Sequence, residues 1–157
     1  MRIQKTMIAF LVLVSGTFAI SLTSCEREKG CGETNISSHG ADDSHNNGRN
    51  CFSCHTSGGE GEGCFNAAGT TYKSNGSASK NGTVKLYTGE NSTGTLRATI
   101  EVDNLGNFYT TDDIDFSGGL YPTVISSTGN VYEMSDDITT GACNSCHGVS
   151  TDRLEID

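Results

Sequence analysis

The chain has 157 residues, a formal net charge of −9, and seven Cys but a single Pro and no Trp. This length suits one domain after removal of a leader, and the acidic balance argues against nucleic acid as a partner. Because only 34% of the residues are hydrophobic while 20 are Gly, we expect disulfides, metals or cofactors to complete a small core.

Residues 1–24 are predicted to be a lipoprotein signal peptide. Arg2 and Lys5 precede an apolar run over 7–14 that is too short to span a bilayer. The sequence Leu-Thr-Ser-Cys25 resembles the lipobox of bacterial lipoproteins. The resemblance implies lipidation of Cys25 and export to the cell envelope, on the outer membrane, facing the periplasm or the cell surface. Acyl chains contribute about 0.8 kcal/mol per buried CH₂. Ordinary signal-peptidase cleavage and an uncleaved anchor are the alternatives.

Residues 25–50 are predicted to be a polar loop region. The segment is rich in Gly, Asp and Asn and has neither a helical nor a strand period. It contains His39 and His45, two side chains that can bind a metal.

Two pentapeptides share the pattern C-x-x-C-H. They are Cys51-Phe-Ser-Cys54-His55, within a predicted first haem-binding segment 51–66, and Cys143-Asn-Ser-Cys146-His147, within a predicted second segment 136–157. The pattern is typical of c-type haem attachment. The two thiols form thioethers with one haem, and the adjacent His is the proximal iron ligand. The sequence therefore predicts two haem c groups, with His55 and His147 on the irons.

Other chemistries use the same Cys spacing. C-x-x-C also occurs in redox-active dithiols and in zinc sites, and two copies could form a Cys₄ zinc centre. Structural zinc sites are more common in intracellular proteins, and redox dithiols occur near a βαβ pattern, whereas this chain is predicted to be exported and lacks that pattern. Neither alternative accounts for a His in the same place in both motifs.

Two Cys remain after one is assigned to lipid and four to haem. Cys31 and Cys64 are expected to form a disulfide in an oxidising compartment, with two free thiols as the alternative. The bridge would enclose the first motif and contribute about 3 to 4 kcal/mol on the chain-entropy model.

The remaining His suggest the distal iron ligands. The sequence has four His in all, so His45 and His39 are the candidates for the sixth positions, and solvated surface residues are the alternative. Met134 competes as a ligand but is better explained by packing. Two His on each iron would leave no open position for a substrate, which favours electron transfer over catalysis.

Residues 67–135 are predicted to form a small antiparallel β-sandwich. Most of five short segments alternate apolar with polar side chains, as strands do. Turn residues separate the segments at intervals of about ten positions, which is typical of a small sandwich. The predicted strands are Gly69–Lys73, Thr83–Tyr87, Thr95–Val102, Asn107–Thr110 and Tyr121–Ile125. The predicted fold class is all-β.

The order of these features resembles known families. Gly82-Thr-Val-Lys-Leu-Tyr87, Asp103-Asn-Leu-Gly-Asn-Phe108, Tyr121-Pro and a turn at Gly129 resemble the transthyretin-like, carboxypeptidase-regulatory-like β-sandwich family, over residues 68–134. The whole mature chain is similar to small dihaem cytochromes, in which a His-Asn-Asn-Gly sequence precedes the first motif and a sandwich separates the two. Cys64 stands where Trp often occurs in that group.

These features predict an electron carrier rather than an enzyme. Redox proteins or extracellular acceptors would be its partners, with the lipid holding it to the membrane. Oligomerisation into a haem-containing wire or filament is compatible with this function. The alternatives are a dihaem enzyme such as a peroxidase, and a mainly structural filament or binding module.

Overall fold

The computed structural model describes residues 31–157. The predicted signal peptide and lipidated Cys25 lie outside the described residues. Within residues 31–157 the elements are η1 Cys51–Ser53, β1 Ala67–Tyr72, β2 Thr83–Gly89, β3 Thr93–Glu101, β4 Asn107–Thr110, β5 Tyr121–Ile125, β6 Val131–Glu133, β7 Gly141–Ala142, η2 Cys143–Ser145 and β8 Leu154–Glu155. No helix in this part of the chain has the length and apolar character needed to cross a membrane.

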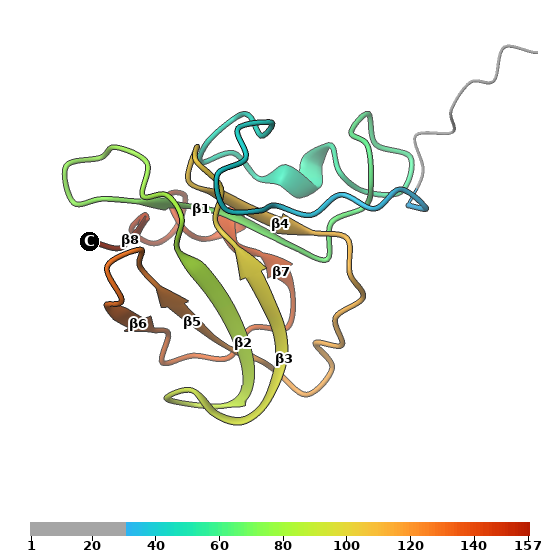
Figure 1. The fold of residues 1–157 in the computed structure, drawn as a ribbon. Coiled ribbons are helices and arrows are strands. Elements are labelled where there is room, and N and C mark those ends of the chain that lie inside the picture. The colour runs from blue at the N-terminus through green and yellow to red at the C-terminus, as the bar shows by residue number, and fades with distance from the viewer. Residues whose placement is uncertain (1–30) are drawn as a thin grey trace, which may run out of the picture.

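The strands form two sheets of four (Figure 1). In the first sheet, β1 is central, with β4 on one side and both β7 and β8 on the other. The second sheet has the order β3-β2-β5-β6, and all its pairs are antiparallel. The predicted all-β class is confirmed, with sheets arranged in the manner of a β-sandwich.

Side chains from both sheets build one core. In β2 the buried residues Val84 and Leu86 alternate with more exposed neighbours, which is the period-two pattern of a half-buried strand. They join Ile100 and Val124 of the second sheet and Phe108 of the first. At about 25 cal/mol per Å² of apolar area buried, this cluster supplies much of the driving force for folding.

A turn carries the chain from β3 in the second sheet to β4 in the first. The Asp103 side chain is fully buried, and its Oδ1 accepts hydrogen bonds from the backbone N–H groups of Leu105 and Asn107. Gly106 has φ +84°, a left-handed conformation that Gly adopts readily. This turn places Asn107 at the start of β4.

The five predicted strands are confirmed, but the sheets extend further than predicted. Two strands have the predicted bounds and three differ by a few residues. β6, β7 and β8 were not predicted from the sequence. The first sheet continues beyond residue 135, because β7 and β8 pair with β1, and they do so in parallel. Each of these two strands has only two residues, too few to show a period.

Candidate functional site

The two C-x-x-C-H motifs adopt the same local fold. In each, the first three residues form a 3₁₀ turn, η1 or η2. The backbone N–H of His55 donates to Cys51 O at 2.9 Å, and that of His147 donates to Cys143 O at 3.0 Å. The second Cys of each motif is exposed. Each pentapeptide is thus one closed turn that holds two thiols beside an imidazole.

Both His rings are fixed through Nδ1. His55 Nδ1 lies 2.9 Å from Glu62 O, and His147 Nδ1 lies 3.0 Å from Asp152 O. Because a carbonyl oxygen only accepts, Nδ1 must carry the proton in each ring, which leaves the Nε2 lone pair available. This is the tautomer and the outer contact of a metal-binding imidazole.

Aromatic packing further orients the His55 ring. Phe65 stacks on it with ring centres 4.0 Å apart and planes 8° apart, and Tyr109 stacks on Phe65 at 5.0 Å. Gly61 passes so close that a Cβ there would lie 2.7 Å from His55 Nδ1. The imidazole therefore sits between a stacked ring and a backbone that tolerates no side chain.

A cavity of about 790 Å³, here called the first cavity, opens at the first motif. Cys51, Cys54, His55 and His45 all line it. The ring centres of His45 and His55 are 6.0 Å apart. Two metal–nitrogen bonds of about 2 Å, plus about 1 Å from each ring centre to its nitrogen, add up to roughly 6 Å. The separation therefore suits one metal ion bound between the two rings.

A second cavity, of about 330 Å³, lies at the other motif. It is lined by Cys143, Cys146 and His147, by Met134, and by the core residues Val84, Phe108 and Val124. Both volumes lie within the range of about 300–1,000 Å³ that is common for ligand and cofactor pockets. A group bound here would contact the core of the sandwich directly.

The thiols of the two first Cys are held in the protonated form. Burial raises the pKa of the Cys51 thiol. Burial also raises the pKa of Cys143, to about 12, with a smaller contribution from Cys51 nearby. A redox-active dithiol instead needs an attacking thiol of lowered pKa. These environments therefore do not favour the dithiol alternative.

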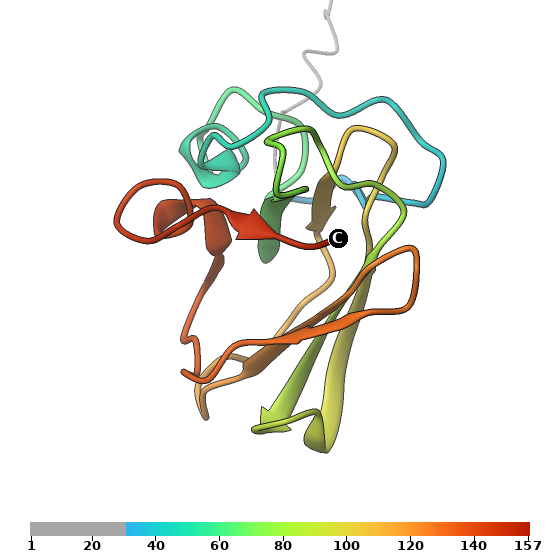
Figure 2. The ribbon, with the colours of Figure 1, turned by 90° about the vertical axis from the view of Figure 1, so that its left-hand side faces the viewer.

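A buried polar cluster joins the two motifs. Thr70, Asn107 and Asn144 are at most 3% exposed. Thr70 Oγ1 donates to Asn107 Oδ1 at 2.6 Å and accepts from Asn144 Nδ2 at 3.0 Å. Asn144 Nδ2 also donates to Arg49 O at 2.9 Å, two residues before the first motif. Figure 2 shows the segment of η1 beside the C-terminal segment, which carries η2.

The same cluster holds the loop of His45. Asn107 Nδ2 donates to Ser44 Oγ at 2.8 Å and lies 3.4 Å from His45 O. Gly48 N donates to Thr70 Oγ1 at 2.9 Å. The backbone on both sides of His45 is therefore fixed to the first sheet.

Asn144 also supplies a hydrogen bond at a position of β1 where no strand pairs with it on the side of β7 and β8. β1 pairs with β7 at Ala67 and Ala68 and with β8 at Thr71 and Tyr72. Between these points the second motif leaves the sheet, and Asn144 Oδ1 accepts the hydrogen bond of Thr70 N at 3.1 Å. The side chain takes the place of a missing strand, as a buried N–H requires.

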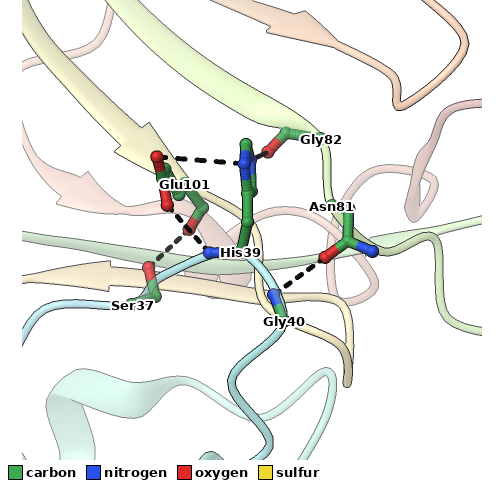
Figure 3. Close-up of polar contacts among 6 residues, drawn as sticks. All are labelled: Ser37, His39, Gly40, Asn81, Gly82 and Glu101. Carbon is green, nitrogen blue, oxygen red and sulfur yellow. Dashed lines mark hydrogen bonds and ion pairs between the residues drawn. The ribbon is translucent and has the colours of Figure 1, made fainter.

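His39 lines neither cavity. Figure 3 shows its contacts with Gly82 and Glu101. Its Nε2 lies 2.7 Å from Gly82 O, and its Nδ1 lies 3.8 Å from a carboxylate oxygen of Glu101. The backbone N–H of His39 donates to the same carboxylate at 2.8 Å. Its predicted role as an iron ligand stays a prediction. Within one chain, these contacts tie His39 to the second sheet.

The predicted disulfide between Cys31 and Cys64 is present, with 4.5 Å between the Cα atoms. Its loop encloses η1 and His45. Sequence reasoning missed the roles of Thr70, Asn107 and Asn144, since their partners lie far away along the chain. The only local signal was a polar Asn inside the second motif.

No protein family, curated protein or solved structure compared with this chain matches it. Within residues 31–157, no three or more His, Cys, Asp or Glu side chains gather as a group that could hold a metal ion by themselves.

Proposed function

We propose that this protein is a lipid-anchored, dihaem c-type cytochrome that transfers electrons at the cell envelope. The observation that carries the proposal is the repeated geometry of the two C-x-x-C-H turns. In each, the imidazole is fixed through Nδ1 to a backbone carbonyl, and the two thiols and the ring line one cavity. Haem attachment requires these groups together.

The first site offers a complete set of protein ligands. Cys51 and Cys54 would form the thioethers, His55 would be the proximal ligand, and His45 the distal one. The 6.0 Å between the two ring centres supports this pairing. With both axial positions held by imidazoles, the site leaves no open position for a substrate, which favours electron transfer over catalysis.

The second site would hold its haem through Cys143, Cys146 and His147. Its apolar floor suits a porphyrin, because burial of apolar surface in the cavity is favourable. The cofactor would thereby complete a core for which the chain supplies few apolar residues.

A bound haem iron takes up and releases a single electron, which is the chemistry that the cofactors would contribute. Contact between the two motifs supports neighbouring positions for the two haems. The hydrogen bond from Asn144 in η2 to Arg49 before η1 holds the motifs against one another. Neighbouring haems would allow electrons to pass through the domain without movement of the protein.

Cys25 would carry the lipid that retains the domain at the membrane. The transthyretin-like family remains the proposed family of the domain, on the sequence motifs named above. Redox proteins or extracellular acceptors are the proposed partners, and self-assembly into a haem-containing filament is compatible with this role.

The proposal is tested on protein produced in a host that matures c-type cytochromes. Anaerobic titration with a one-electron mediator should reduce and reoxidise two haems per chain reversibly. Addition of hydrogen peroxide should cause no catalytic turnover. Sustained peroxide consumption, lost on substitution of His147, would identify an enzyme and contradict the proposal.

A further inference from the structure

We propose that the two haem sites are unlike, and that Met134 supplies the sixth ligand of the second haem. The inference rests on the proposed function, since it concerns the ligands of the proposed cofactor. It replaces the expectation that each iron has two His ligands and that Met134 only packs.

The distribution of His among the cavities is the first argument. The sequence has four His, all within the described residues. His45 and His55 line the first cavity, and His39 lines neither. Among the residues of one chain that line the second cavity, His147 is the single imidazole, so a second ligand from the same lining is of another kind.

Met134 is placed to be that ligand. It follows directly after β6, and its backbone N–H donates to Pro122 O of β5 at 3.0 Å, which fixes its position at the edge of the second sheet. The half-buried side chain lines the second cavity together with Cys143, Cys146 and His147. Met134 lies nine residues before Cys143 in the sequence, and both line the same cavity.

The surroundings of the cavity suit a thioether ligand. Val84, Phe108 and Val124, which line it, belong to the buried core. Sulfur of Met is a soft, neutral ligand that requires no charge or hydrogen-bond partner, whereas a buried imidazole would need a partner for its second nitrogen.

The two sites would then differ in redox properties. Ligation by His and Met raises the reduction potential of a haem relative to ligation by two His. The second site would be the more oxidising one. Electrons would therefore reside preferentially on the haem near the C-terminus.

Spectroscopy and potentiometry of the holoprotein test this assignment with two matched variants. Met134→Leu removes the sulfur and nearly conserves volume, and His39→Gln removes the remaining unassigned imidazole. The wild type should show a sulfur-to-iron absorption band and two separate reduction steps. Met134→Leu should lose the band, convert one of the two low-spin signals to high-spin, and lower the higher potential. His39→Gln should leave all three unchanged.

The results separate this inference from the proposed function. A wild type with two attached haems but no sulfur-to-iron band would overturn the Met134 assignment and leave the dihaem proposal intact. An effect of His39→Gln on one haem would do the same. A protein that carries no haem would instead contradict the proposed function. Met134→His should keep both haems low-spin while it lowers the higher potential, and failure of that rescue would count against the assignment.

Discussion

Asn144→Ala should lower the free energy of unfolding by more than the loss of one hydrogen bond would. The substitution removes three hydrogen bonds, from Thr70 N, to Thr70 Oγ1 and to Arg49 O. Each is worth about 1 kcal/mol, and a buried N–H left unpaired costs at least as much. We therefore expect a loss of about 3 kcal/mol in the free energy of unfolding. For a domain of this size, that corresponds to a fall in Tm of roughly 10 °C.

Denaturant titration of the holoprotein, followed by circular dichroism, measures this loss. Ser145→Ala is the matched control, because its hydroxyl is exposed and its hydrogen-bond partners, Ala142 O and Cys146 Sγ, both lie within three residues of it along the chain. Asn144→Asp keeps the shape but removes both donated hydrogen bonds, so it should also destabilise. If Asn144→Ala and Ser145→Ala had equal effects, the proposed connection between the two motifs through this side chain would be refuted.

Three other variants, one with a matched control, test separate features of the protein. Replacing Cys31 and Cys64 together by Ser opens a loop of 33 residues, and the free energy of unfolding should fall by about 3.7 kcal/mol on the chain-entropy model; an unchanged denaturation midpoint would contradict this. Gly61→Ala would put a Cβ 2.7 Å from the imidazole of the first motif and should disturb the low-spin spectrum of one haem. Gly118→Ala, with no neighbour within 4 Å of its Cβ, should leave the spectrum intact. Cys25→Ser should release the protein from membranes into the soluble fraction, and persistent membrane association would rule out lipidation at this residue.

Local pattern was sufficient for most of the fold. Thr83–Tyr87 alternates apolar with polar side chains, and Asn107–Thr110 and Tyr121–Ile125 are bounded by turn residues, so their positions could be predicted. β7 and β8 could not be predicted in this way. Each exists because β1 offers a free edge at that point, and this depends on how distant parts of the chain meet.

The candidate site likewise has one part that the sequence predicts and one part that it does not. C-x-x-C-H is a local motif. The Cys31–Cys64 pair could be predicted because these two Cys remain once the other five are assigned to lipid and haem. That His39 lines neither cavity depends on packing between segments far apart in sequence. Met134 lines the second cavity because the pairing of its backbone with Pro122 holds it at the edge of the second sheet. The sequence contains the necessary side chains, but it does not indicate which of them share a cavity.

Intact mass spectrometry of the processed protein tests the central claim most directly. Protein matured in a competent host should weigh the polypeptide and lipid plus two haem groups, while a variant with Cys51 and Cys54 replaced by Ala should retain one. A colourless protein whose mass equals polypeptide and lipid alone would contradict the account.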